Sequence, residues 1–252
     1  MKKKNKEKSD IWARFPKLNN ISKDKFPNHL LIIPDGNGRW AKKLGKYPLE
    51  GHKKGAEVIK KVLNDLSDLP IKYVTVWGFS SDNWRRAPWE VSGLMKIFEQ
   101  YVKNNLSQLL KNDKRFIQLG RKDRIPVSLK NILSAVEKDT QKGKNGFFCI
   151  AIDFGGDDQE LRMMEKARKL PKNINLNSDT IKKLRDGDGK IPPADLIIRT
   201  SGEQRISNLG WLAENAEFYS IKRLLPDTNT KDFVEGIIEY SKRDRRFGGR
   251  KN

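Results

Sequence analysis

The sequence predicts a single α/β domain with a mainly parallel central sheet covered by helices on both faces. Six short segments read as strands because they are apolar throughout and do not alternate, which is typical of strands buried on both faces. Helix-like patterns of apolar residues separate these strands. We find no internal repeat and no linker to a second domain, and 252 residues suffice for one sizeable α/β domain.

In chain order, the predicted strands cover residues 29–34, 73–79, 115–120, 147–156, 194–200 and 217–221. The predicted helices cover 54–68, 90–111, a segment opened by Pro126, 158–170 and about 230–244. The first of these helices shows the apolar period most clearly, through Ile59, Val62, Leu63 and Leu66. We assign the catalytic domain to residues 28–249 and interpret residues 1–27 as a basic N-terminal extension that is in part disordered.

Composition narrows the class of protein without selecting a function. The formal net charge of +20 suits polyanions such as nucleic acid, an anionic membrane or phosphorylated small molecules, although a lysine-rich surface without a special role explains it equally well. Cys149 is the single cysteine, which excludes an intrachain disulfide and fits a reducing compartment. No apolar stretch approaches the roughly 20 residues of a membrane span, and the basic start lacks the apolar core of a secretory signal. We therefore expect a cytoplasmic protein.

Three polar clusters directly follow predicted strands: DGNGR at 35–39, SSDNWRR at 80–86 and RTSGEQRIS at 199–207. In parallel sheets, ligands bind at the carboxyl ends of the strands. Each cluster alone is an ordinary surface loop, but three at one sheet edge indicate a shared binding site.

The first cluster admits several interpretations. Asp-Gly and Asn-Gly favour a hairpin, but the residues that follow do not form a partner strand. Gly36, Gly38 and Ala41 fit a dinucleotide fingerprint, but no acidic residue follows at the required distance, and no Gly-Lys pair continues with Ser or Thr as in a Walker A loop. A phosphate loop remains: its glycines bring backbone N–H groups to anionic oxygens, Arg39 neutralises them and Asp35 holds Mg²⁺.

The other two clusters supply further anion-binding groups. Residues 78–90 carry two hydroxyls, an amide, two arginines and Glu90. Residues 199–207 place Arg199, Arg205 and Ser207 around a glycine turn, which suits a second diphosphate through charge-assisted hydrogen bonds.

Together the segments HLLIIPDGNGRWAKKLG…GH, FSSDNWRR…EV, DLIIRTSGEQRISN, AEFY and RDRRFGG resemble the successive signatures of the cis-prenyltransferases, the undecaprenyl diphosphate synthase family. The resemblance runs from about His29 to Gly249. It implies an α/β domain, usually a homodimer, with an elongated apolar tunnel between sheet and helices. It also implies Mg²⁺-dependent condensation of isopentenyl diphosphate with an allylic diphosphate such as farnesyl diphosphate, giving a cis-polyprenyl diphosphate, for example the undecaprenyl-type lipid carrier precursor.

The resemblance assigns roles residue by residue. Asp35 would be the catalytic Mg²⁺ ligand, and Glu217 would reach the metal from the dimer partner. The allylic diphosphate would be bound by Gly36, Asn37, Gly38, Arg39 and Trp40, with His52 nearby. The mobile loop that orients substrates and assists proton removal would comprise Ser80, Asn83, Trp84 and Arg86, with Glu90 helping it to close. The diphosphate of isopentenyl diphosphate would be held by Arg199, Arg205 and Ser207.

Departures from the family pattern leave the type of condensation open. Pro48 occupies the place of an arginine, so a phosphate contact is lost or is supplied by a lysine such as Lys46. The usual N-Y-G-G-R-x-[DE] reads DFGGDDQ, with Asp157 in place of the arginine and Gln159 in place of the acid. Ser201 replaces a glycine, and the chain is one residue short between Ser207 and Glu217. A short-chain, branching or cyclising member of the family is therefore an alternative.

From a different class, a basic protein that binds nucleic acid or membranes would explain the charge, but not the acids Asp35 and Glu90 among the basic clusters. We expect no nucleic-acid partner. Peripheral membrane contact through the basic termini is a milder hypothesis, since a polyprenyl product is very apolar and basic segments are attracted to anionic lipid.

Overall fold

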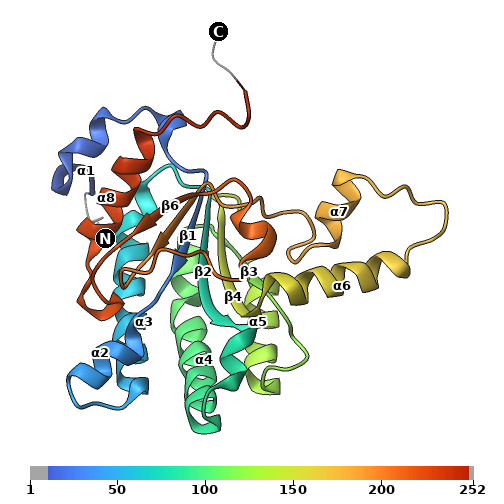
Figure 1. The fold of residues 1–252 in the computed structure, drawn as a ribbon, viewed down its shortest axis with the longest axis horizontal. Helices are drawn as coiled ribbons and strands as arrows, with labels where there is room; N and C mark the ends of the chain where they lie inside the picture. The colour runs from blue at the N-terminus through green and yellow to red at the C-terminus, as the bar shows by residue number, and fades with distance from the viewer. Residues whose placement is uncertain (1–10, 250–252) are drawn as a thin grey trace, which may run out of the picture.

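A computed structural model describes residues 11–249, and it contains one six-stranded, all-parallel sheet (Figure 1). The strands lie in the order β3-β4-β2-β1-β5-β6. Their bounds are β1 His29–Ile33, β2 Tyr73–Ser80, β3 Arg115–Leu119, β4 Phe147–Phe154, β5 Leu196–Arg199 and β6 Glu217–Ser220. All six predicted strands are therefore confirmed, and the predicted fold class with them.

The described α-helices are α1 Ile11–Arg14, α2 Asn37–Lys43, α3 Pro48–Asp65, α4 Pro88–Lys111, α5 Val127–Asp139, α6 Gly156–Arg168, α7 Ser178–Leu184 and α8 Thr230–Ser241. Five of them correspond to predicted helices. The short helices α1, α2 and α7 were not predicted. The helix α3 begins six residues earlier than predicted, because Pro48 occupies its first turn and Glu50 caps it by accepting from the Tyr47 backbone N–H.

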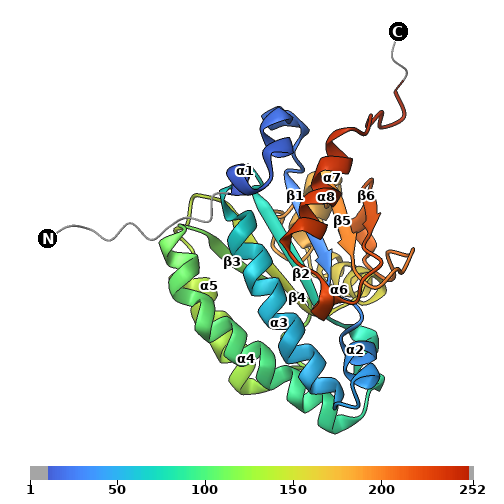
Figure 2. The same cartoon turned by 90° about the vertical axis from the view of Figure 1, so that its left-hand side faces the viewer.

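One face of the sheet packs against α3, α4, α5 and α8, as the view in Figure 2 shows for α3 and α4 running side by side. The opposite face is covered mainly by the chain on either side of β5, residues 191–195 and 200–216, which places Leu209 and Leu212 on Leu31 and Ile197. This cover contains only a short 3₁₀ helix, Gly210–Ala213, where the sequence predicted α-helices. Helices α6 and α7 extend away from the sheet as an arm (Figure 1). Buried strands with apolar residues on both faces account for the apolar runs in the sequence.

The boundary predicted at residue 27 does not mark the edge of the packed domain. Ile11 and Leu18 are completely buried, and Phe26 is nearly so, in the same core cluster as Phe233 and Ile237 of α8. Burial of these side chains offsets the cost of ordering a lysine-rich segment. The part of the predicted extension before residue 11 lies outside the described residues.

Candidate active site

The three polar clusters meet at one edge of the sheet, as predicted. β2, β1 and β5 are neighbours, so Asp35 after β1, residues 81–86 after β2 and residues 200–207 after β5 all follow adjacent carboxyl ends. The Asp35 backbone N–H donates to Thr200 Oγ1 (2.8 Å), and the Thr200 hydroxyl donates to the Asp35 carbonyl (2.7 Å). These two bonds fix the first cluster directly to the third.

The Asp35 carboxylate is the electrostatic centre of this edge. Its Oδ2 accepts from Arg199 Nη2 (2.9 Å), and its Oδ1 accepts from the Gly36 N–H (2.6 Å) and from Arg39 Nη2 (3.2 Å). Burial alone would raise its pKa, but the hydrogen bonds and charges of Arg199 and Arg39 outweigh burial and hold the pKa of Asp35 below its usual range. Asp35 is therefore a carboxylate at neutral pH.

The conformation of the turn after Asp35 requires glycines in two places, at the start of α2 and on the face of α3 that packs against the turn. Gly36 has a φ of 97° and caps α2, and a Cβ there would lie 2.9 Å from Leu224 Cδ2. On α3, a Cβ at Gly51 or Gly55 would lie 2.1 Å from the Asn37 carbonyl or the Asn37 Oδ1. The spacing Gly51-His52-x-x-Gly55 thus lets α3 approach the turn closely, and it places His52 beside the site.

A polar hollow opens over this turn. It has a volume of about 530 Å³ and is lined by Asp35, Gly36, Asn37, Gly38, Arg39, Lys42, Lys46, Pro48, His52, Arg86 and Glu90, among others. Four basic side chains and the turn glycines therefore surround one space with Asp35 at its edge. Such a space suits an anion that carries several oxygens.

An apolar cavity of about 300 Å³ runs from the polar hollow into the layer between the sheet and α3 and α4. Its apolar lining includes Ile33, Ala56, Ile59, Val76, Trp77, Leu94, Ile97, Phe98, Tyr101, Phe148 and Ile150. The polar hollow and this cavity share Pro34, Asp35, Asn37, His52 and Arg86. A ligand with an anionic head and an apolar tail would thus place their junction beside Asp35.

A second, smaller cavity lies farther along α3 and α4, towards the amino ends of β2 and β4. It measures about 80 Å³ and shares Tyr101 and Phe148 with the first cavity. These two aromatic side chains therefore form the wall between the two cavities.

His52, Arg86 and Glu90 form a small group at the mouth of the apolar cavity. Arg86 Nη1 donates to Glu90 Oε1 (3.1 Å), and His52 Nε2 lies 3.7 Å from the same oxygen. Burial, and then the neighbouring charge of Arg86, lower the pKa of His52 to about 4. His52 is thus neutral at pH 7, and Glu90 is paired with the arginine.

The segment after β2 is a 3₁₀ helix, Ser81–Arg85, whose start is capped by Ser80 and Asn83. The Ser80 N–H donates to Asn83 Oδ1 (3.0 Å), and Ser80 Oγ accepts from the Asp82 N–H (3.2 Å). Trp84 turns away from the cavity, and its Nε1 donates to Asp153 Oδ1 (2.9 Å). Ser80, Asn83 and Arg86 line the apolar cavity.

The third cluster surrounds Arg199. Arg199 Nη1 donates to Ser207 Oγ (2.9 Å) and to the Arg205 carbonyl (2.6 Å), and both Arg199 and Ser207 line the apolar cavity. The Arg205 side chain is exposed and pairs with Glu203, so it does not line either space. Ser201 adopts a φ of 76° where a glycine was expected, and its Oγ accepts from Arg39 Nη2 (2.6 Å).

Besides Trp84 and Arg205, two more predicted site residues, Trp40 and Glu217, lie away from both spaces. Trp40 Nε1 donates to Asp227 Oδ1 (2.7 Å), which directs the indole out of the polar hollow. Glu217 begins β6 beside Leu196, whereas Asp35 follows the far end of β1, and Glu217 pairs with Arg243 (2.8 Å). Within one chain, Glu217 and Asp35 do not meet.

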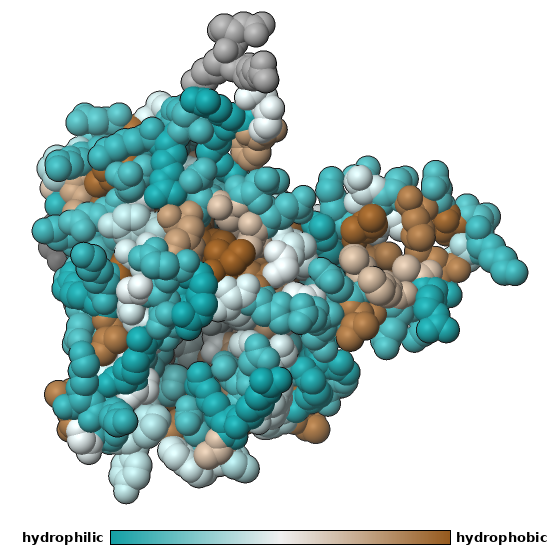
Figure 3. Space-filling model, viewed as in Figure 1, coloured by the Kyte–Doolittle hydropathy of each residue, from teal (hydrophilic) through white to brown (hydrophobic). Residues whose placement is uncertain are grey.

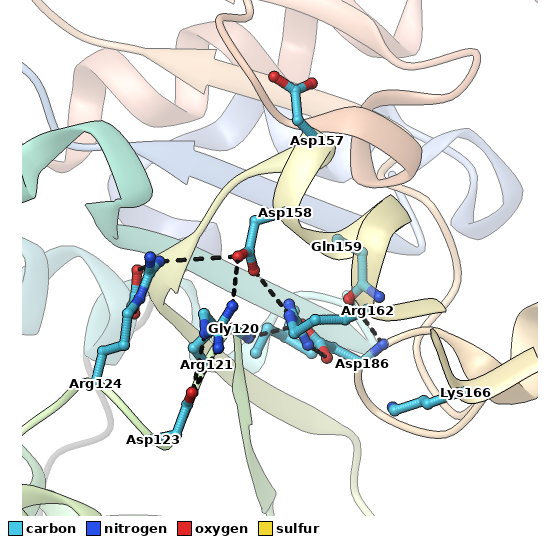
Figure 4. A network of polar contacts seen from close by, with 12 residues as sticks. Gly120, Arg121, Asp123, Arg124, Asp157, Asp158, Gln159, Arg162, Lys166 and Asp186 are labelled. Carbon is cyan, nitrogen blue, oxygen red and sulfur yellow. Dashed lines mark hydrogen bonds and ion pairs between the residues drawn. The ribbon is translucent and has the colours of Figure 1, made fainter. Parts of the chain in front are cut away.

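The two residues that depart from the family pattern at 157 and 159 lie in different environments. Asp157 points away from its neighbours into solvent (Figure 4). Gln159 is buried, and its Oε1 accepts from the Asp186 N–H (3.0 Å).

Lys42, which was not among the predicted site residues, also lines the polar hollow. Lys42 lies one helical turn after Arg39 and so on the same face of α2, but this could be inferred from the sequence only if residues 37–43 had been predicted as a helix.

Similarity to known proteins agrees with this geometry. Residues 33–248 match the family model described as "Putative undecaprenyl diphosphate synthase". The isoprenyl transferase of Fusobacterium nucleatum is 40% identical over 90% of this chain and 98% of its own, and that of Thermotoga maritima is 40% identical over 89% and 98%. A solved structure of lavandulyl diphosphate synthase from Lavandula x intermedia, in complex with dimethylallyl diphosphate, is 32% identical, with a TM-score of 0.83 over 89% of this chain and 99% of that one.

The fold and the site thus define an enzyme that transfers prenyl groups. More specifically, the chain belongs to the undecaprenyl diphosphate synthase family of cis-prenyltransferases, the isoprenyl transferases. Among residues 11–249, no helix is long and apolar enough to cross a bilayer.

Proposed function

We propose that this enzyme condenses isopentenyl diphosphate with an allylic diphosphate, with Mg²⁺, to give a cis-prenyl diphosphate. The observation that carries the proposal is the junction of the polar hollow with the apolar cavity at Asp35. A prenyl diphosphate has the same two parts, an anionic head and an apolar tail. With the head in the polar hollow and the tail in the cavity, its reacting C–O bond lies at the junction.

The basic side chains of the polar hollow stabilise the leaving diphosphate. As the allylic C–O bond breaks, negative charge grows on the diphosphate, and Arg39, Arg86, Lys42 and Lys46 are placed around that space. Lys46 also lies 5.7 Å from the Trp40 ring, next to Pro48, where the family pattern has an arginine. We assign the missing phosphate contact to Lys42 and Lys46.

Arg199 and Ser207 bind the second diphosphate. They line the same cavity as Asn83 and Ser80, on the side of the loop after β5. There the alkene of isopentenyl diphosphate lies near the allylic carbon, and holding the two together removes much of the entropic cost of reaction. A carbon–carbon bond forms between the two substrates, the allylic C–O bond breaks to release diphosphate, and the new chain loses a proton.

A magnesium ion fits this donor set with one protein carboxylate. The described residues contain no group of three or more His, Cys, Asp or Glu side chains arranged to hold a metal. Mg²⁺, however, commonly binds one or two carboxylates together with substrate phosphates. The ionised Asp35, at the edge of the polar hollow, supplies such a carboxylate. When bound, the metal would neutralise charge on the diphosphate oxygens.

A homodimer would complete this donor set. Glu217 is distant from Asp35 within one chain, so it reaches a metal at Asp35 only from a second copy.

The arm formed by α6 and α7 also presents an apolar surface, visible as a brown area on the right of Figure 3. Its exposed apolar residues are Leu161, Met164, Ile174, Leu176 and Ile181. Such an apolar surface suits a protein partner. Light scattering of Leu161→Glu with Met164→Glu tests the dimer, and a monomeric wild type would contradict it.

A second candidate is a condensation that uses allylic diphosphates alone. It is favoured by the similarity to lavandulyl diphosphate synthase, whose solved structure holds dimethylallyl diphosphate. The Arg199–Ser207 arrangement suits any second diphosphate and does not by itself select isopentenyl diphosphate.

A product assay separates these candidates. Purified enzyme is given labelled isopentenyl diphosphate with dimethylallyl, geranyl, farnesyl or geranylgeranyl diphosphate, with and without Mg²⁺, and each allylic diphosphate is also tested alone. Mg²⁺-dependent incorporation of label supports the proposal. Product formed only from allylic diphosphates supports the second candidate, and no product with any combination contradicts both.

Peripheral membrane contact in the cytoplasm follows from the same product chemistry. Residues 1–25 carry nine Lys or Arg against three acids, and a prenyl product needs an apolar destination. Co-sedimentation with anionic liposomes that does not change after removal of the first ten residues would count against this part of the proposal.

A further inference from the structure

Trp84 links the site loop to a charged network that lies outside the substrate spaces. The network occupies the carboxyl ends of β3 and β4 and the start of α6 (Figure 4). Its centre is Asp153, whose side chain is fully buried and whose φ is 53°. A buried carboxylate and a positive φ both cost free energy, so Asp153 needs partners that stabilise its charge and its backbone conformation.

Two partners satisfy the Asp153 carboxylate. Arg124 donates from Nε to Oδ2 (2.8 Å) and from Nη2 to Oδ1 (2.5 Å), so it forms a two-pronged ion pair. Trp84 Nε1 donates to Oδ1 as well (2.9 Å). Because the Trp84 ring also packs edge-on against Phe79 at 5.2 Å, the indole is fixed at both its ring and its nitrogen.

A second layer holds Arg124 and the start of α6. Asp158 Oδ1 lies 3.9 Å from Arg124 Nη2 and accepts from Arg121 Nη1 (3.0 Å), while Asp158 Oδ2 accepts from Arg162 Nε (2.8 Å). Arg162 also pairs with Asp186, which accepts from the Gly120 N–H (2.8 Å). Arg124 is thus placed between two carboxylates, and its position is determined by β3, β4 and α6 together.

The same segment also touches the loop directly. A Cβ at Gly155 would lie 2.2 Å from Ser81 Oγ, so the start of α6 packs tightly on the loop. The Gly156 N–H donates to the Asn208 carbonyl (2.9 Å), next to Ser207. The network therefore lies against both substrate loops, while Asp153, Arg124 and Trp84 line neither the polar hollow nor the apolar cavity.

We propose that Arg124 and Asp153 are positioning residues: by holding Trp84, they keep residues 80–86 in the conformation that presents Asn83 and Arg86 to the cavity. They act through Trp84 and do not contact substrate. The catalytic part of this proposal rests on the proposed function, but the effect on the loop does not.

The first test uses limited trypsin digestion, because Arg85 and Arg86 are cleavage sites inside the loop. Arg124→Gln and Trp84→Phe are compared with wild type, and the fragments are identified by mass spectrometry. We expect cleavage after Arg85 or Arg86 to be faster by about fivefold or more in both variants. Trp84→Phe loses the hydrogen bond that joins the loop to Asp153, and Arg124→Gln loses the ion pair that holds the Asp153 carboxylate in place. Trp89→Phe and Arg168→Gln, which change exposed residues of α4 and α6, are matched controls and should be cleaved after Arg85 or Arg86 at the wild-type rate.

A double substitution distinguishes positioning from general damage. Arg124→Gln leaves the Asp153 carboxylate buried without its ion pair, whereas Arg124→Gln with Asp153→Asn removes that charge and keeps an oxygen that can accept from Trp84. We expect the double variant to regain most of the protection lost in Arg124→Gln. Should Arg124→Gln fail to fold, Trp84→Phe, which leaves the ion pair intact, still decides the question.

The enzymatic readout is the division between kcat and KM. A displaced loop should lower kcat by about 10- to 100-fold in Trp84→Phe and Arg124→Gln, with KM for both diphosphates changed much less. Unchanged loop cleavage in both folded variants would overturn the proposal. If the wild type forms no product, the proposed function fails, and the digestion still confirms or overturns the positioning role.

Discussion

Arg199 connects the two halves of the site by holding Asp35 through Nη2 (2.9 Å) and Ser207 through Nη1 (2.9 Å). One guanidinium therefore neutralises the carboxylate after β1 and organises the loop after β5. A cation at Asp35 would compete with Arg199, and a diphosphate at Arg199 would compete with Asp35. Binding of either ligand releases the group that the other needs, so the two should bind cooperatively.

Replacement of Asp35 by Asn should lower kcat/KM by about 10²- to 10³-fold, the range typical for loss of a group that stabilises developing charge. It should also abolish the stimulation of activity by Mg²⁺, because an amide is a poor substitute for a carboxylate ligand. Steady-state kinetics over a Mg²⁺ titration measures both effects. Glu57→Gln, which changes an exposed carboxylate of α3, is the control. A Mg²⁺ response that persists in Asp35→Asn would contradict the assignment of Asp35.

Gly36 and Gly38 should differ when each is changed to Ala. At Gly36 the φ of 97° and the close Leu224 side chain both oppose a Cβ, so we expect a loss of about 1–2 kcal/mol in the free energy of unfolding, together with lower activity. At Gly38 no atom lies within 4 Å of a Cβ, and the position is helical, so stability should be unchanged or up to about 1 kcal/mol higher.

The Gly38 variant should nevertheless bind the allylic diphosphate less well, because its new methyl group stands in the lining of the polar hollow. Thermal unfolding and the KM for the allylic diphosphate separate the two effects. A Gly38→Ala enzyme with unchanged KM would place the diphosphate elsewhere.

Both histidines should remain neutral down to about pH 5. Burial is the main cause that lowers the pKa of His29 and of His52, in each case to about 4. The unfolded chain takes up these protons near pH 6.5, so stability is complete above that pH and falls as the pH drops from 6.5 towards 4. The expected loss is at most about 1.4 kcal/mol per pH unit for each histidine.

Urea unfolding at pH 7, 6 and 5 measures this loss, and His52→Gln should roughly halve its slope. Because the chain has only two histidines, NMR can follow both imidazoles directly. An imidazole that titrates in the folded protein near pH 6.5 would contradict the predicted burial effect.

The sheet and the position of the site could be predicted because they depend on local patterns. Apolar runs marked β1, β2 and β5, and the rule that ligands bind at carboxyl ends brought Asp35, Ser80 and Arg199 together. Helix α2 could not be recognised in this way. Its residues read as a loop, and it forms where Gly36 adopts a positive φ and Asn37 packs on Gly51 and Gly55 of α3.

Long-range packing also explains the other differences. Ile11 and Leu18 stand among lysines in the sequence, and their burial depends on α8, more than 200 residues away. The charged network around Asp153 joins β3, β4, α6 and the segment at Asp186, so no local sequence pattern could predict it. The wall of the apolar cavity likewise joins α4 to β4.

That wall should limit the length of the product. Tyr101 and Phe148 separate the apolar cavity of about 300 Å³ from the cavity of about 80 Å³ beyond it, so a growing chain meets these rings when it fills the first space. A first cavity at the small end of the range for ligand pockets suits a short prenyl tail. Tyr101→Leu and Phe148→Leu remove part of the wall and join the two spaces.

We expect the leucine variants to form products longer by one or more isoprene units from the same primer, at a stability cost smaller than the roughly 3–5 kcal/mol of a buried aromatic changed to Ala. Tyr101→Phe keeps the ring and should leave product length unchanged, which makes it the matched control. Chromatography of dephosphorylated products from each primer gives the length distribution. If both leucine variants give the wild-type distribution, then a residue nearer Asp35, such as Phe98 or Leu94, ends the chain before it reaches the wall.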